Sequence, residues 1–198
     1  MWETSLNGRY LCACAAACAA LSITAQAVEV TYKLDPTHTY PSFEADHYNG
    51  VSIWRGKFNK SSGVMLLDRA RQSGALDVTI DMSSVDTGNH QLDDILRSKT
   101  VFDVDSYPVA TYKSTEVVFK GDVPVAVLGN LTLHGVTMPV ELKIQSFKCI
   151  ESPLLKKEVC GTESTAVFDR SDFGLAIAKD HGFNMNTTLH IQAEGIKQ

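Results

Sequence analysis

Residues 129–145, with the sequence GNLTLHGVTMPVELKIQ, decide the fold class. Apolar residues alternate with polar ones on both sides of His134-Gly135, with Leu131 and Leu133 before it and Val140, Leu142 and Ile144 after it. Successive side chains of a strand point to opposite faces, so each half of the stretch predicts a strand with one apolar face. His-Gly is a turn signal. The stretch therefore predicts two antiparallel strands joined by a tight turn.

The same two-residue period recurs along the rest of the chain. It is clear in two further segments, Leu76-Val78-Ile80-Met82 and Leu189-Ile191-Ala193, and weaker in Phe43-Ala45-His47, Trp54-Gly56-Phe58 and Tyr112 to Phe119. Turn signals separate these segments, among them Asn49-Gly50, Ser73-Gly74, Lys120-Gly121-Asp122 and His181-Gly182. Alternating strands separated by turns are typical of an all-β fold.

One segment, Asn89 to Lys99, breaks this pattern. Leu92, Ile95 and Leu96 have helical spacing, acidic residues precede basic ones, and Asn89 is suited to cap the first turn. About eight antiparallel strands with one short helix fit a single closed β-barrel, which also removes exposed sheet edges.

Composition and charge restrict the function. The chain has 198 residues, 44% of them hydrophobic, which suits one domain with a buried core. Its net charge of −5 provides no basic field for nucleic acid. No apolar run reaches the roughly 18 residues needed to span a membrane as a helix.

The first residues have the pattern of an export signal. Arg9 precedes the apolar run from Leu11 to Ile23, and Ala25-Gln26-Ala27 is a small-x-small cleavage site. We expect cleavage after Ala27, so that residues 1–27 are a signal peptide and residues 28–198 form the exported domain.

Cleavage leaves two cysteines, Cys149 and Cys160. An even pair in an exported chain indicates one disulfide that closes a loop. The alternative, a two-thiol metal or redox site, requires a nearby His or a C-x-x-C spacing, and the sequence has neither.

Seven short motifs occur in a fixed order along residues 28–198. They are Tyr32-x-Leu34-Asp35-Pro36-x-His38, Phe43-Glu44-Ala45-Asp46-His47, Arg55-Gly56-Lys57-Phe58 with Gly63, Ser84-Val85-Asp86-Thr87-Gly88, Phe102-Asp103 with Tyr107-Pro108, Gly129-x-Leu131-Thr132-Leu133-His134-Gly135-Val136-Thr137-x-Pro139-Val140, and Asp169-Arg170-Ser171-Asp172-Phe173-Gly174. In order and spacing the chain resembles the YceI-like family of bacterial exported proteins.

The resemblance implies a lipocalin-like antiparallel barrel whose interior holds a long isoprenoid or similar amphiphile. It also implies a periplasmic protein that is not an enzyme. An eight-stranded barrel either holds one slender ligand or is filled by its own side chains, so the cavity itself rests on the resemblance.

The residues expected to face the barrel interior share apolar character and alternate with polar neighbours. They are Phe43, Trp54, Phe58, Leu76, Val78, Ile80, Met82, Tyr112, Leu131, Leu133, Val140, Leu142, Ile144, Phe168, Leu189 and Ile191. Each one alone fits ordinary core packing, whereas together they would form a lining for a prenyl or acyl chain.

The charged candidates have structural interpretations. The six His residues show no H-x-H or H-x₃-H spacing, so we expect no metal site and predict that His38 fixes a turn beside Asp35. Arg170 lies between Asp169 and Asp172, which is typical of a structural ion pair. In the alternative, Arg170 faces the barrel mouth and contacts a polar head group.

Neither a G-x-S-x-G nucleophile motif nor a Gly-rich phosphate loop occurs, so the sequence predicts neither catalysis nor a cofactor. Two hypotheses remain: a periplasmic lipid carrier, and a stress or interaction protein with a filled barrel and functional surface loops. The sequence leaves the lipid and the oligomeric state open, a dimer being one option.

Overall fold

The decisive stretch forms the hairpin of β8 (Val123–Leu133) and β9 (Val136–Glu151) in the computed structural model, which describes residues 29–198. Leu133 pairs with Val136, so His134 and Gly135 alone form the loop. Their φ angles are 51° and 76°, and positive φ at both central residues is typical of a tight type I′ turn. The predicted turn is confirmed. The predicted signal peptide lies outside the described residues.

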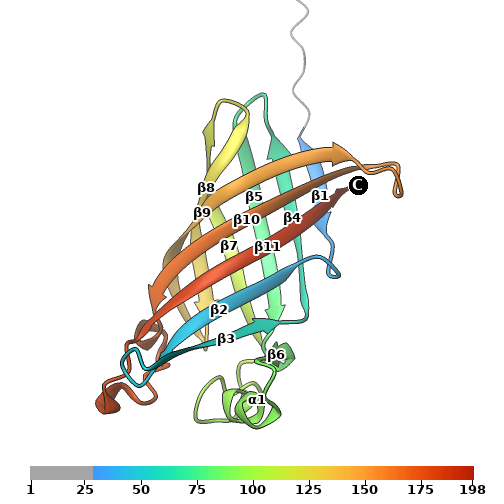
Figure 1. The fold of residues 1–198 in the computed structure, drawn as a ribbon. Coiled ribbons are helices and arrows are strands. Elements are labelled where there is room, and N and C mark those ends of the chain that lie inside the picture. The colour runs from blue at the N-terminus through green and yellow to red at the C-terminus, as the bar shows by residue number, and fades with distance from the viewer. Residues whose placement is uncertain (1–28) are drawn as a thin grey trace, which may run out of the picture.

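A ring of antiparallel strands closes into a barrel (Figure 1). In order around the ring these strands are β1 (Val30–Leu34), β4 (Ser61–Asp68), β5 (Ser73–Asp81), β7 (Val109–Lys120), β8, β9, β10 (Glu158–Asp169) and β11 (Asn186–Lys197), and β11 pairs back onto β1. The all-β barrel expected from the period-two pattern is therefore confirmed, with eight strands in the ring.

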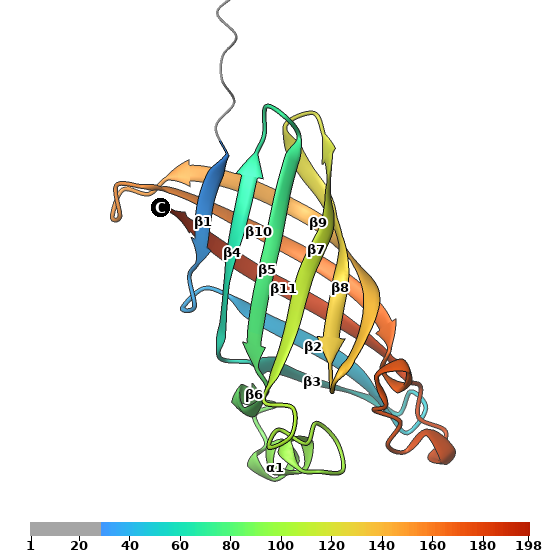
Figure 2. The same ribbon diagram turned by 180° about the vertical axis from the view of Figure 1, so that it is seen from behind.

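Three further strands extend the wall at one end. β2 (Tyr40–His47) pairs with β11 beside the part of β11 that pairs with β1, β3 (Ser52–Phe58) pairs with β2, and β6 (Val85–Asp86) pairs with β3. β11 thus has two partners along one side. Figure 2 shows the barrel from behind. The near wall consists of β4, β5, β7 and β8 and runs steeply across the far wall of β10, β11, β2 and β3. The barrel is elongated along the direction of the near strands.

The predicted helix is present as α1 (His90–Arg97), which lies beyond one end of the barrel in Figures 1 and 2. Asn89 caps it, as expected, by accepting hydrogen bonds from the backbone N–H groups of Gln91 and Leu92 at 3.1 and 3.3 Å. Asp93 is buried and accepts hydrogen bonds from both Thr87 N–H and Thr87 Oγ1–H. These bonds tie the helix to the loop that follows β6.

Residues 29–198 also contain three short 3-10 helices: η1 (Met82–Ser84), η2 (Arg170–Phe173) and η3 (Lys179–His181). η2 and η3 belong to the connection between β10 and β11 and lie at the same end of the barrel as α1 (Figure 1). We call this end the α1 end. The opposite end carries the β4–β5, β7–β8 and β9–β10 turns and the bond between Cys149 and Cys160, and we call it the disulfide end.

A close approach inside the barrel explains one glycine of the decisive stretch. The Tyr112 ring lies across Gly129, where an added Cβ would be 2.6 Å from the ring. The Tyr112 hydroxyl donates to the backbone carbonyls of Val127 and Val140 at 3.0 and 2.9 Å. A side chain at position 129 would displace the ring, so the sheet requires glycine there.

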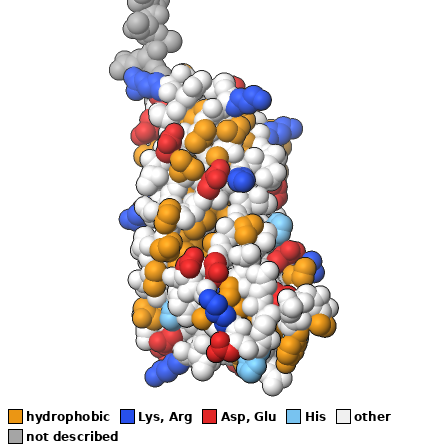
Figure 3. Space-filling model, turned by 90° about the vertical axis from the view of Figure 1, so that its left-hand side faces the viewer, with side chains coloured by type: hydrophobic (Ala, Val, Ile, Leu, Met, Phe, Trp, Pro, Cys, Tyr) orange, Lys and Arg blue, Asp and Glu red, His pale blue; other side chains and the backbone are white. Residues whose placement is uncertain are grey.

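The outer wall mixes hydrophobic and charged side chains, as Figure 3 shows for one face. This fits strands that alternate between an inner apolar face and a mostly polar outer one. Within residues 29–198, no helix has the length and apolar character that crossing a membrane requires.

Candidate functional site

The barrel is hollow. A cavity of about 560 Å³ runs inside it, lined by side chains from the ring strands, from β2 and β3 and from α1. Exposed lining residues gather at the α1 end, where Asn89, Gln91, Ile95 and Ile177 surround the cavity mouth. At the disulfide end the lining residues Leu67, Pro124 and Cys160 are buried, whereas Ala75 beside the β4–β5 turn is exposed.

Every apolar residue expected to face the interior lines this cavity. The structure brings together Phe43, Trp54, Phe58, Leu76, Val78, Ile80, Met82, Tyr112, Leu131, Leu133, Val140, Leu142, Ile144, Phe168, Leu189 and Ile191. Many of them also pack on one another in the main apolar cluster of the barrel. Their contact with a ligand stays a prediction, whereas their shared position on the inner face is a feature of the fold.

Sequence reasoning missed the residues that form the mouth. Leu92, Ile95 and Leu96 of α1 line it from one side, and Ile177 and Phe183 of the β10–β11 connection line it from another. The helical spacing of the first three was visible and predicted a helix, but not its position across the barrel end. The β10–β11 connection has no periodic pattern of apolar residues, so no local signal predicted that it lines the cavity.

Missed residues also line the cavity at the disulfide end. In the β9–β10 pair, Glu163 is opposite Ser146 and Ser164 is opposite Ile144, so Gln145 is an extra residue of β9 that forms a bulge and reverses the alternation. Ile144 therefore faces inward before the bulge, and Phe147 and Cys149 face inward after it. A strict two-residue period would have placed Phe147 outside.

The Trp54 indole belongs to an aromatic group at the α1 end. Its ring centroid lies 6.0 Å from that of His47, which in turn lies 5.5 Å from Phe183, both in edge-on geometry. On the opposite face of β3, the exposed Arg55 donates to Glu44 at 2.7 Å outside the barrel. The orientation of β3 thus places the indole on the cavity and the cations in solvent, as burial costs require.

Arg170 also lines the cavity, at the mouth. Its guanidinium donates to the backbone carbonyl of Ile177 at 2.9 Å and to that of Leu175. Burial lowers the pKa of Arg170, and the nearby Asp169 and Asp46 carboxylates act in the opposite direction. Among the described residues no ion pair joins Arg170 to Asp169 or Asp172, and Asp169 instead accepts from Ser171 N–H and Ser171 Oγ–H at 2.8 and 2.6 Å. The position of Arg170 suits the alternative, in which it contacts a head group.

The disulfide between Cys149 and Cys160 is present, as predicted. The two residues are directly opposite each other in the β9–β10 pair. Cys160 packs with Tyr32 and Leu67 in a second, smaller apolar cluster. Leu67 and Cys160 of this cluster also line the cavity at the disulfide end.

His38 fixes a turn, as expected. Its Nδ1 lies 2.8 Å from Oδ2 of Asp35, whose other oxygen accepts from Thr37 N–H and Oγ1–H. Within residues 29–198, one group has donor atoms close enough for a metal ion: Asp35, His38 and Glu194. Both Asp35 oxygens already form hydrogen bonds within the turn. We therefore interpret the role of these residues as stabilising the connection between β1 and β2.

The imidazole of His38 is expected to titrate above its ordinary pKa, since the hydrogen bond to Asp35 and the carboxylate charge raise it. Burial opposes ionisation of Asp35, but bonds from His38 and Thr37 outweigh it and lower the Asp35 pKa. The interaction therefore favours the folded state at pH values below the ordinary pKa of His. Its contribution is lost as the pH rises through the raised pKa.

An NMR titration of the His38 ring protons measures this shift, and Asp35→Asn should return the pKa to its ordinary value. An unchanged pKa in that variant would show that Asp35 is not the cause.

A family model described as the YceI-like domain matches residues 32–195. A UPF0312 protein of Pseudomonas aeruginosa is 35% identical over 183 residues, which cover 90% of this chain and 93% of the relative. Two solved structures share the fold. BcnA of Burkholderia cenocepacia has a TM-score of 0.66 at 21% identity, covering 81% of this chain and 98% of that one.

The second is described as a polyisoprenoid binding domain from Saccharophagus degradans, with a TM-score of 0.62 at 19% identity, covering 84% of this chain and 98% of that one.

Proposed function

The chain belongs to the YceI-like family, and from this premise we propose that it is a non-catalytic carrier that holds one long amphiphilic lipid in its barrel. The lipid is of polyisoprenoid, quinone or fatty-acyl type. The observation that carries the proposal is the elongated apolar cavity, whose exposed lining residues lie mainly at the α1 end. Its volume of about 560 Å³ is within the range of roughly 300–1,000 Å³ typical of small-molecule sites.

The lining explains how such a lipid would be held. Its chain would contact aliphatic and aromatic side chains along the barrel, and each buried CH₂ contributes about 0.8 kcal/mol. Affinity then grows with chain length and needs few polar contacts, which favours recognition of a class of lipids over a single compound. The name of the Saccharophagus degradans domain, which has the same fold, supports the polyisoprenoid class.

The polar end of the lipid would lie at the mouth. Arg170 is held there by two backbone carbonyls, and Thr87, Asn89 and Gln91 contribute further polar groups to the rim. Asp46 lies close enough to Arg170 to affect its titration, so the rim is not strongly cationic. This arrangement suits a neutral or weakly anionic head group.

We place the carrier in the periplasm. The apolar run before Ala27 supports export, and a disulfide persists in an oxidising compartment. Intact-mass measurement of protein from the periplasmic fraction should give a chain that begins at Val28. Recovery of the full-length chain from the cytoplasm would reject this location.

Extraction of the purified protein with organic solvent, followed by mass spectrometry, tests the carrier function. We expect a prenyl or acyl lipid in a molar ratio near one, since the cavity is a single connected space. Protein that yields no lipid and then binds neither geranylgeraniol nor oleic acid would favour a function in the surface loops.

A fluorescence titration tests the position of the lipid. Trp2 lies in the predicted signal, so Trp54 is the only tryptophan of residues 28–198. Geranylgeraniol added to delipidated protein should change the Trp54 emission saturably, because the indole lies on the cavity. Saturable binding by calorimetry with constant emission would place the lipid away from Trp54.

A further inference from the structure

The β9–β10 hairpin extends beyond the barrel as an arm, visible at the disulfide end in Figures 1 and 2. Pairing between β8 and β9 ends at Ala126 and Lys143, whereas β9 continues to Glu151 with β10 as its partner. We define the arm as residues 144–162. Because β10 pairs with β11 from Val159 onward, the part that projects past β11 is the Glu151–Glu158 pair and the turn 152–157.

The tip of the arm combines two exposed leucines with two lysines in the sequence Ser152-Pro153-Leu154-Leu155-Lys156-Lys157. Leu154 is 90% exposed, more than any other large apolar side chain of residues 29–198, and Leu155 is 50% exposed. Both lysines are exposed, and the turn contains no carboxylate. Leaving two leucines in water at a loop tip is unfavourable unless they are buried in another phase or partner.

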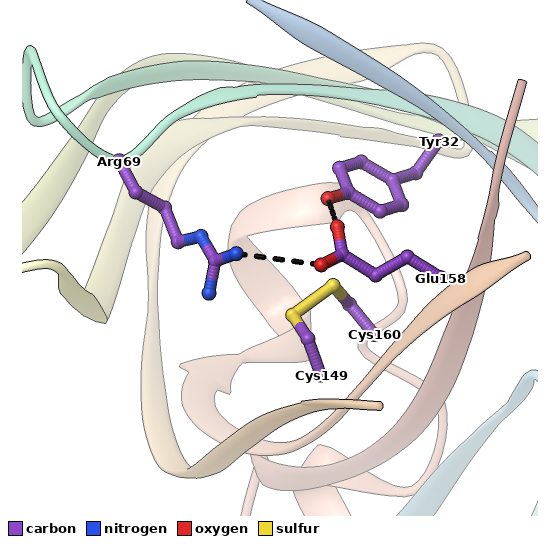
Figure 4. Close-up of a disulfide and its surroundings, with 5 residues drawn as sticks. All are labelled: Tyr32, Arg69, Cys149, Glu158 and Cys160. Atoms are coloured by element: carbon purple, nitrogen blue, oxygen red, sulfur yellow. Dashed lines mark hydrogen bonds and ion pairs between the residues drawn. A yellow bond between two sulfur atoms is a disulfide. The ribbon is translucent and has the colours of Figure 1, made fainter. Parts of the chain in front are cut away.

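The base of the arm is braced, as Figure 4 shows. The disulfide joins its strands, and Glu158 accepts a hydrogen bond from Tyr32 and lies 3.5 Å from Arg69. Burial and the adjacent Glu158 raise the pKa of Tyr32 to about 12, so the phenol keeps its proton and donates. Within the turn, Ser152 and Lys157 are hydrogen-bonded through Ser152 N–H at 2.9 Å. The leucines are thus held outward on a rigid support.

We propose that the tip of this arm docks on the surface of a lipid bilayer that contains anionic phospholipid. Leu154 and Leu155 would enter the boundary between head groups and acyl chains, and Lys156 and Lys157 would contact lipid phosphates. An apolar insert flanked by cations is the combination that binds anionic interfaces.

Charge decides which end of the molecule approaches the bilayer. The segment 81–107 at the α1 end carries Asp81, Asp86, Asp93, Asp94, Asp103 and Asp105 against Arg97 and Lys99. At the disulfide end, the three hairpin turns and the residues beside them carry Arg69, Arg71, Lys120, Lys156 and Lys157 against Asp68, Asp122, Glu151 and Glu158. An anionic surface would therefore repel the α1 end and attract the arm, although the protein as a whole has a charge of −5.

Continuity with the cavity favours a bilayer over a protein as the occupant. Phe147 and Cys160 of the arm line the cavity, so the base of the docking element adjoins the space that fits a lipid chain. This one argument rests on the proposed function, whereas the exposed leucines and the charges do not.

Sedimentation with vesicles of phosphatidylcholine alone, or mixed with phosphatidylglycerol, tests the proposal with the full protein. Binding to the mixed vesicles should fall at least about tenfold in Leu154→Ser/Leu155→Ser, because much of the insertion is lost. In Lys156→Gln/Lys157→Gln it should fall roughly fivefold per lysine and depend less on salt. Val51→Ser is the matched control, since Val51 is 79% exposed in the β2–β3 turn at the α1 end.

Several results would overturn docking through the arm. They are absence of binding to the mixed vesicles, equal binding to both vesicle types, an unchanged leucine variant, or loss of binding in Val51→Ser. The Trp54 titration with geranylgeraniol serves as a second readout for each variant. Normal titration with lost vesicle binding separates failure of docking from failure of the carrier function, and it also reports that the variant is folded.

Discussion

The Ala193→Phe substitution is expected to lower the affinity for a prenyl or acyl lipid by at least about tenfold, which corresponds to roughly 1.4 kcal/mol. Ala193 lies on the inner face of β11 and lines the cavity, where it is opposite Thr162 of β10. A phenyl ring at this position would occupy space that the chain of the lipid needs. Because the ring enters an existing cavity, the cost of overpacking a dense core does not apply.

The neighbouring Gln192→Phe variant is the matched control. Gln192 is exposed on the outer face of the same strand, so a phenyl ring there leaves the cavity unchanged. Calorimetry with geranylgeraniol measures both variants, and thermal unfolding checks that each is folded. Equal affinity in the two variants would place the lipid outside the barrel.

Replacing both Cys149 and Cys160 by serine is expected to lower the free energy of unfolding by about 3 kcal/mol. The two residues are 11 positions apart, and the open loop gains conformational entropy in the unfolded chain. Burying a serine hydroxyl where the Cys160 sulfur packs with Tyr32 and Leu67 adds to the loss.

Denaturant unfolding of the wild-type protein, with and without a reducing agent, separates the two causes. The reduced wild-type protein should lose the entropic part alone, and the double variant should lose more. If reduction leaves the midpoint unchanged, the bond does not constrain the unfolded chain in the expected way.

Most of the inner face could be predicted from the sequence because a strand buries every second residue. Leu76, Val78 and Ile80 show this alternation without interruption, and all three line the cavity. The α1 helix was also predictable, since Asn89 and the spacing of Leu92, Ile95 and Leu96 are local signals.

Features that depend on contacts between distant segments were not predictable. The bulge opposite Glu163 and Ser164 exists in the pairing of β9 with β10, and the spacing of Phe147 alone does not reveal it. The role of Arg170 depends on where the chain returns after η2, because its partners are carbonyl groups that any residue provides. Because every residue has a backbone carbonyl, the residue types do not reveal which carbonyl accepts from Arg170.

The shared edge of β11 has a consequence for folding. Residues 32–34 pair with residues 195–197, and residues 40–45 pair with residues 187–192, so strands far apart in the sequence meet only after β11 has been synthesised. Contacts of such long sequence separation slow folding. A ribosome-bound chain that lacks β11 leaves β1, β2 and β10 with open edges, which are templates for aggregation. Barrel closure therefore waits until β11 has been synthesised, because β11 provides the pairing partner of all three edges.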